Sequence, residues 1–196
     1  MDKDNLIQFF QNGLPMSANK AEQLAEKFKA RKIARNDYLL KQGAICNESH
    51  FIENGIIRSY TYDFKGDDVT TGFYSKKMFF SDLLSFFKRI PSKEYIQALT
   101  DCEAWYLTYE DMQTNFHTFP EFREFGRLNI INQYGLLKQR MLSMLQETAE
   151  QRYMDLINSY PEIIQNVPLK HIASYLGITD TSLSRIRKES VKKQII

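Results

Sequence analysis

The stretch Leu169-Lys-His-Ile-Ala-Ser-Tyr-Leu-Gly-Ile-Thr-Asp-Thr-Ser-Leu-Ser-Arg-Ile-Arg-Lys-Glu189 decides the fold of the C-terminal part of the chain. Ile172 and Leu176 place apolar groups on one face of a first helix, where small Ala173 lets a second helix cross closely. Gly177 tolerates the positive φ that a short turn between two helices requires. The spacing therefore predicts a helix-turn-helix.

The second helix of this motif has one apolar side and one polar, basic side. Ile178 fills the turn and Thr179 is a good N-cap, while Leu183 and Ile186 face the first helix. A helix that enters the major groove needs a polar outer face without bulky apolar groups. The residues expected on that face, or beside it against phosphates, are Thr181, Ser184, Arg185, Arg187, Lys188 and Lys192. The alternative is a corner of two helices that never contacts DNA.

The charge of the chain is uneven although its net charge is only +2. Residues 151–196 hold seven Lys and Arg against four Asp and Glu, a net charge of +3, so the first 150 residues carry −1. A basic end on a nearly neutral body suits a domain that binds a polyanion, although many basic C-termini are only solvated. With 43% hydrophobic residues, no apolar run of membrane-spanning length and no signal peptide, we expect a folded cytoplasmic protein without a membrane partner.

The residues that most often form catalytic or metal sites are few and scattered. Cys46 and Cys102 lack CxxC spacing, and we expect both to be ordinary thiols. Cys46 and His50 lie four residues apart in an expected loop, but two ligands do not make a metal site. His117 and His171 have no paired base nearby in the sequence. The sequence therefore predicts neither catalytic residues nor a metal site.

The first half of the chain changes from helical to strand periodicity. Two short helices are expected first, the second capped by Ser17, and from about residue 31 the apolar period becomes two. The expected strands cover residues 38–41, 56–62, 69–74, 95–100 and 104–108, with a hairpin turn at 65–67. Turn signals at this spacing favour an antiparallel β-roll or sandwich.

A single long helix is expected from residue 121 to 150, a range without proline. It carries a seam with the 4, 3, 4, 3 spacing of a coiled coil, made of Ile130, Tyr134, Leu137, Met141 and Met144. A second apolar stripe contains Leu128, Ile131, Leu142 and Leu145. Two stripes suggest two partners, the β domain for one and a second subunit for the other. The alternative is one broad stripe buried within a monomer. A shorter helix, 149–159, follows.

With these motifs the sequence resembles the Crp/Fnr family of transcription regulators over nearly its whole length. The likeness is carried by residues 37–43 (Asp-Tyr-Leu-Leu-Lys-Gln-Gly), by 51–58 (Phe-Ile-Glu-Asn-Gly-Ile-Ile-Arg) and most strongly by 172–186. It implies an α+β fold: a cyclic-nucleotide-binding-like antiparallel β-roll of the jelly-roll type, a long dimerisation helix and a winged-helix-like helix-turn-helix. The implied domains are residues 1–115, which sense an effector, 116–148, the dimerisation helix, and 149–196, which bind DNA.

The resemblance also implies a function. The chain would be an effector-modulated homodimer that reads a two-fold symmetric operator in double-stranded DNA, with RNA polymerase as a further partner. Asp180, Thr181 and Arg185 would occupy the base-reading positions. Family members commonly have a basic and an acidic residue before the arginine, so the operator sequence cannot be transferred. The alternative is a ligand-binding or protein-interaction module whose C-terminal domain no longer binds DNA.

The expected effector pocket is where the sequence departs from the family. Cyclic-nucleotide binders carry Gly-Glu-Leu-(small)-Leu followed by Arg-(Ser/Thr)-Ala, whereas residues 81–85 read Ser-Asp-Leu-Leu-Ser and residues 91–95 read Pro-Ser-Lys-Glu-Tyr. The phosphate-binding arginine is absent, Lys93 lacks its planar fork, and Glu94 adds a negative charge. A cyclic nucleotide is therefore disfavoured, and no cofactor is expected. The pocket candidates are Ser81, Asp82, Leu83, Ser92 and Lys93.

Phenylalanines surround this region of the sequence. Phe116, Phe119 and Phe122 recur every three residues, and four more lie in and beside the cassette: Phe79, Phe80, Phe86 and Phe87. They could line an apolar effector pocket or only pack the roll against the long helix.

Overall fold

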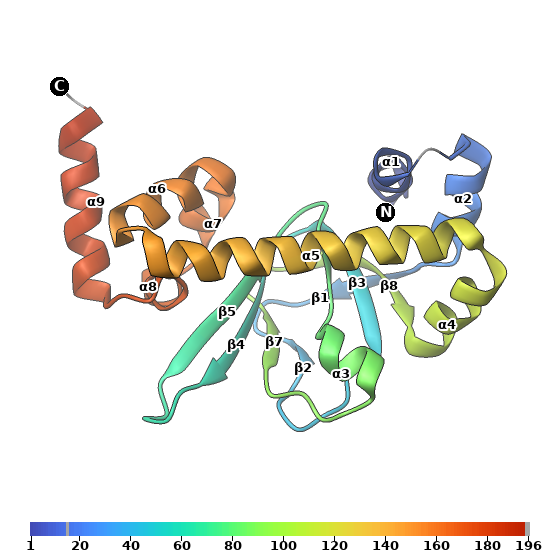
Figure 1. The fold of residues 1–196 in the computed structure, drawn as a ribbon, viewed down its shortest axis with the longest axis horizontal. Helices are drawn as coiled ribbons and strands as arrows, with labels where there is room; N and C mark the ends of the chain where they lie inside the picture. Colours follow the sequence, from blue (N-terminus) through green and yellow to red (C-terminus); the bar gives the residue numbers. More distant parts are fainter. Residues whose placement is uncertain (15, 195–196) are drawn as a thin grey trace.

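A computed structural model describes residues 1–14 and 16–194 of the chain, with side chains up to residue 190. Within these described residues, eight strands form two four-stranded antiparallel sheets, as the sequence predicts for a β-roll (Figure 1). One sheet has the order β1-β8-β3-β6 and the other β2-β7-β4-β5. The bounds are β1 (Lys29–Ile33), β2 (Tyr38–Leu40), β3 (Glu48–Asn54), β4 (Ile57–Tyr62), β5 (Asp68–Tyr74), β6 (Phe79–Phe80), β7 (Tyr95–Ala98) and β8 (Cys102–Thr108).

The hairpin between β4 and β5 shows how turn chemistry fixes this sheet. Asp63 accepts hydrogen bonds at its Oδ1 from the backbone N–H groups of Lys65 (2.8 Å) and Asp67 (3.0 Å). Gly66 has φ +88°, a conformation that glycine adopts without a steric penalty. The predicted turn at 65–67 is therefore confirmed. It leaves β5 at the edge of its sheet, where its backbone groups remain open to another element.

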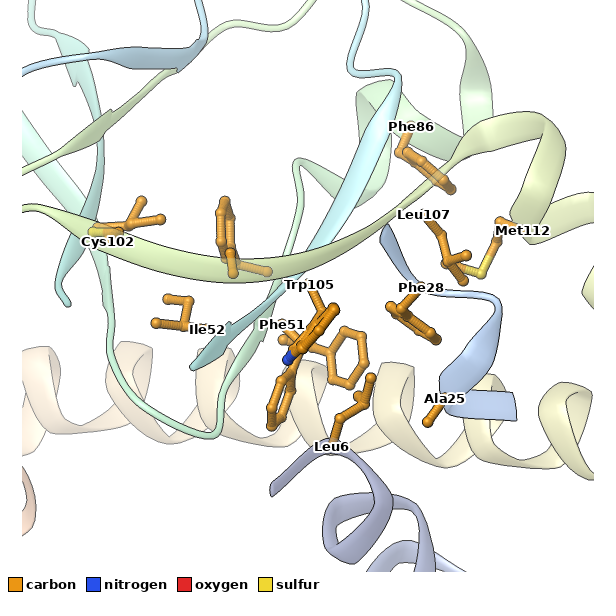
Figure 2. Packing of buried hydrophobic residues seen from close by; sticks show 14 of the residues in the cluster. Leu6, Ala25, Phe28, Phe51, Ile52, Phe86, Cys102, Trp105, Leu107 and Met112 are labelled. Atoms are coloured by element: carbon orange, nitrogen blue, oxygen red, sulfur yellow. The ribbon is translucent and has the colours of Figure 1, made fainter. Parts of the chain in front are cut away.

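The core of the roll is closed by two N-terminal helices, α1 (Asp4–Gly13) and α2 (Ala18–Glu26). The Ser17 side chain accepts a hydrogen bond from the N–H of Lys20, which confirms the predicted cap. Figure 2 shows Leu6 of α1 beside Phe51 and Trp105 of the roll. Because Leu6 and Phe51 are fully buried, the helices and the β1-β8-β3-β6 sheet share one hydrophobic core.

The long helix α5 (Pro120–Gln146) crosses the whole molecule, with the roll along one side of it (Figure 1). Between α2 and α5 the chain also forms α3 (Leu83–Lys88) and α4 (Tyr109–Thr118). The long helix was expected to include residues 116–118, but these residues end α4. The chain bends at Phe119, whose extended φ of −119° precedes a proline at the first helical position. No helix among residues 1–14 and 16–194 has the length and apolar character that crossing a membrane requires.

Between residues 147 and 194, four helices follow α5: α6 (Ala149–Ser159), α7 (Pro161–Asn166), α8 (Leu169–Leu176) and α9 (Asp180–Gln194). They lie at its C-terminal end, opposite to α1 and α2 (Figure 1). The bounds of α6 match the predicted helix 149–159. Because every regular element between residues 147 and 194 is a helix, the expected strands of a wing do not occur in this range.

Candidate functional site

The turn between α8 and α9 has the geometry that the sequence predicts. Gly177 ends α8 with φ +69°, and the N–H of Ile178 donates to the carbonyl of Ala173 at 3.0 Å. The hydroxyl of Thr179 accepts from the N–H of Ser182 at 3.2 Å and caps α9. Leu183 is fully buried and Ile186 is 8% exposed, so the two helices share one core. The helix-turn-helix is confirmed.

The outer face of α9 is open to solvent. Thr181, Ser184, Arg185 and Lys188 are exposed, Asp180 is exposed in the first turn, and Arg187 is half-buried at the side. Lys192 belongs to the same helix, but its side chain lies outside the described residues. The structure thus places Thr181, Ser184, Arg185 and Lys188 together on one exposed face.

Helix α8 is docked on the edge of the roll. The N–H of Thr70 in β5 donates to the hydroxyl of Ser174 at 2.8 Å, and that hydroxyl donates to the carbonyl of Asp68 at 3.2 Å. The Thr70 hydroxyl donates to the carbonyl of His171 at 3.1 Å. A hydrophobic cluster also joins the helix-turn-helix to Phe73 of β5. The open backbone groups of an edge strand are therefore used to hold the candidate DNA-binding unit.

A buried charge cluster lies beneath this contact. Arg58, 1% exposed, donates to both carboxylate oxygens of Asp68, at 2.9 and 3.1 Å, and thereby lowers the pKa of Asp68. His171 has its Nδ1 4.0 Å from Oδ1 of the same carboxylate, without a hydrogen-bond partner. Burial, together with the positive charge of Arg58, lowers the pKa of His171 to about 4. His171 is consequently neutral at pH 7.

The coiled-coil seam of α5 is exposed in the monomer. Its members Ile130, Tyr134, Leu137, Met141 and Met144 are 41–64% exposed, so a stripe buried within a monomer is wrong for these residues. The second stripe was expected to lie on the roll, which is also wrong: Ile131 is 49% and Leu145 76% exposed. The chain therefore presents apolar side chains of both stripes along α5 that the single subunit leaves exposed.

A cavity of about 590 Å³ lies between the roll and the inner side of α5, and we call it the roll cavity. Of the pocket candidates, Ser81, Asp82 and Leu83 line it, whereas Ser92 and Lys93 do not. Six of the seven phenylalanines line the cavity, and six also belong to or pack against the core of the roll, as the packing interpretation expects. The lining members are Phe79, Phe80, Phe86, Phe87, Phe116 and Phe122; the seventh, Phe119, only packs against the core. Phe125 lines the cavity as well.

The polar atoms of the cassette bond to one another. Asp82 accepts from the N–H of Ser85 at 3.0 Å and from the hydroxyl of Ser92 at 2.6 Å. Ser92, which does not line the cavity, therefore holds two residues that do: Asp82 through its carboxylate and Glu94 through its backbone. Lys93 is exposed, and its carbonyl accepts from Thr61. Neither Ser92 nor Lys93 supplies the phosphate-binding cation that this position lacks.

One cation of the roll cavity was not among the predicted site residues. Arg140, on the roll-facing side of α5, donates to the carbonyls of Thr70, Thr71 and Tyr175. It therefore links the cavity, the edge strand β5 and helix α8. Across the cavity, burial raises the pKa of Glu94, which the positive charge of Arg140 partly offsets. A polar heptad line of Gly126, Gln133 and Arg140 in the sequence could have identified this inner side.

Both thiols and His50 are buried. Cys46 and Cys102 are buried free thiols, and burial raises the pKa of both. His50 lies on β3 rather than in the expected loop, stacked on Phe80. In the part of the chain that the structure describes, no three His, Cys, Asp or Glu side chains come together in a way that could hold a metal ion.

Comparisons with known proteins agree with this architecture. Residues 30–118 match the family model of the cyclic nucleotide-binding domain. FixK2 from Bradyrhizobium japonicum has 13% identity and a TM-score of 0.71, over 86% of each chain. CLP from Xanthomonas campestris, a c-di-GMP responsive global regulator, has 14% identity and a TM-score of 0.70, over 91% of this chain and 93% of that chain.

The catabolite activator protein of Thermus thermophilus has 14% identity and a TM-score of 0.55, over 91% of this chain and 85% of its own. No curated protein sequence matches the chain. At these identities the solved structures establish the fold. The predicted order of roll, long helix and helix-turn-helix is confirmed.

Proposed function

We propose that this chain, which has the fold of the Crp/Fnr transcription regulators, is a homodimeric DNA-binding regulator whose roll binds an effector. The observation that carries the proposal is the face of α9. Thr181, Ser184, Arg185 and Lys188 are exposed there while Leu183 and Ile186 are buried behind them. Arg185 has the fork that reads guanine, and Lys188 suits a phosphate.

The dimer is proposed from the apolar surface of α5. A row of large side chains that are roughly half exposed on a monomer commonly marks an interface, because water contact with such a row is unfavourable. Tyr134 and Leu137 lie near its middle and are 63% and 64% exposed. Pairing of this surface with a second copy would place two α9 helices on one duplex, which a two-fold symmetric operator requires.

Modulation by an effector is proposed from Arg140. Its guanidinium lies at the roll cavity and also holds the carbonyls of Thr70 in β5 and Tyr175 in α8. A ligand that moves α5 relative to the roll would change these hydrogen bonds. The position of the helix-turn-helix on the edge of the roll would then change as well. Such a regulator acts in the cytoplasm, where it meets DNA and RNA polymerase, and no catalytic residue is assigned to it.

The proposal is tested by fluorescence anisotropy with labelled DNA. The full chain is titrated onto a sequence selected from random duplexes and onto unselected duplex, at several salt concentrations. Arg185→Ala should cost about 1–3 kcal/mol on the selected sequence and little on unselected DNA, because it reads a base. Arg123→Ala is the matched control, since it removes the same charge from an exposed site on α5 away from α9.

Two outcomes would contradict this proposal. If the wild-type chain shows no salt-dependent DNA binding, the function is that of a ligand-binding or protein-interaction module instead. If Arg185→Ala loses affinity equally on both DNAs, Arg185 does not read a base.

A further inference from the structure

We propose that the roll cavity takes an uncharged, largely aromatic or aliphatic molecule with one hydroxyl or amine group, and that it excludes anions, cyclic nucleotides included. The inference rests on the proposed function only in naming this molecule an effector. Three properties of the cavity lead to it: the chemistry of its wall, its charges and the place where it opens.

The wall of the roll cavity is dominated by aromatic rings. Phe86 and Phe122 are 1% and 2% exposed, and Phe116 packs on Gly126 so closely that a Cβ there would lie 2.8 Å from the ring. The volume of about 590 Å³ falls within the range of ligand pockets. An apolar ligand is stabilised there by the burial of its surface, at about 25 cal/mol per Å².

The charges of the cavity oppose an anion. Two acidic side chains line it, Asp82 and Glu94, against the single cation Arg140. The Arg140 guanidinium already uses three of its five N–H donors on backbone carbonyls of β5 and α8, so at most two remain for an anion. An anion without a matching cation loses its hydration with no replacement. A neutral ligand avoids that cost.

The same acidic groups favour a hydrogen-bond donor on the ligand. Asp82 already accepts hydrogen bonds from Ser85 and Ser92, so Glu94 is the carboxyl group with more acceptor positions left for a ligand. A carboxylate offers about four acceptor positions, and the hydroxyl of the neighbouring Thr71 can fill at most one of them on Glu94. A hydroxyl or amine directed at Glu94 therefore fixes the orientation of an otherwise apolar molecule.

The cavity opens at the α5 seam. Ile130, Tyr134 and Leu137 line the cavity and belong to the exposed seam as well. A second copy paired along α5 would cover this opening, and the bound ligand would then be shielded from water. Binding and dimer formation should therefore strengthen each other, because each hides apolar surface that the other leaves open.

A matched pair of fluorescent probes tests the ligand class on the purified full chain without DNA. N-Phenyl-1-naphthylamine is neutral, aromatic and carries one N–H; its 8-sulfonate derivative differs only by the added anion. We expect saturable binding of the neutral probe, one per subunit, with a dissociation constant at least about tenfold below that of the sulfonate. Tighter or equal binding of the sulfonate, or no saturable binding of the neutral probe, overturns the proposal.

Three variants locate the site. Leu83→Trp fills the cavity and should weaken the neutral probe at least about fivefold, whereas Leu84→Trp, next to it but 59% exposed outside the cavity, should leave it unchanged. Glu94→Gln keeps the shape but removes a negative charge, so it should bring the two probes closer in affinity. Unchanged binding in Leu83→Trp together with an unchanged probe ratio in Glu94→Gln places the probe elsewhere and refutes the site. Failure of DNA binding would leave these results untouched, so the two proposals fail separately.

Discussion

The α5 seam gives the sharpest prediction about assembly. In the double variant Leu137→Glu with Met141→Glu, two apolar side chains that are 64% and 53% exposed become carboxylates. Full burial of such a side chain contributes about 1.5–3 kcal/mol, so covering the exposed half in a dimer contributes about 1 kcal/mol. Four such side chains across a two-fold interface contribute about 4 kcal/mol.

The loss of that burial alone should raise the dimer dissociation constant about a thousandfold. Desolvating four like charges at the interface would add to it. Sedimentation velocity at micromolar concentration should show a monomer, while circular dichroism stays unchanged because both positions are exposed in the folded subunit.

The charge-matched control adds two carboxylates to the side of α5 away from the seam, through Asn132→Glu with Gln139→Glu. Both positions are exposed, and this variant should remain dimeric. If the seam variant sediments as a dimer like its control, the subunits pair through another surface and the reasoning about α5 is refuted.

Three further results are expected. Lys188→Ala should weaken binding to all DNA sequences alike, and the slope of log K against log salt concentration should become about one unit less steep. A loss of affinity confined to one sequence would contradict a phosphate contact. Calorimetry with cyclic AMP and cyclic GMP should give no dissociation constant below about 10 μM, and tighter binding would show that the altered cassette still holds a phosphate. Because burial holds the pKa of His171 at about 4 while an unfolded histidine titrates near 6.5, the unfolded chain takes up the proton first as the pH falls. From pH 7 to pH 5, wild type should therefore lose about 2 kcal/mol more unfolding free energy than His171→Leu, measured by urea titration; equal losses would mean that His171 is not held neutral.

The parts of the fold that the sequence predicted best are those set by local chemistry. The helix-turn-helix depends on Gly177, Thr179 and a few apolar positions, all within some 20 residues, and each takes its expected role. The hairpin at residues 65–67 is local in the same sense. Such features need no knowledge of what the segment packs against.

The features that the sequence did not predict correctly depend on contacts between residues far apart in the chain. Periodicity identified both apolar stripes of α5, but apolar residues on a dimer surface and on a core face give the same pattern, so Ile131 and Leu145 were assigned to the wrong partner. Arg140 was missed because its partners Thr70 and Tyr175 are 70 and 35 residues away. Ser92 was placed in the cavity by analogy, although it lies behind the lining and holds Asp82 and the backbone of Glu94.

The central claim is that the chain binds DNA as a symmetric dimer. Repeated selection of duplexes from a random library by the full wild-type chain, followed by sequencing, tests it most directly. We predict enrichment of a two-fold symmetric sequence, with half-sites separated by about one helical turn of 10–10.5 base pairs or a multiple of it. Absence of enrichment, or enrichment of a single asymmetric site bound by a monomer, would contradict the account.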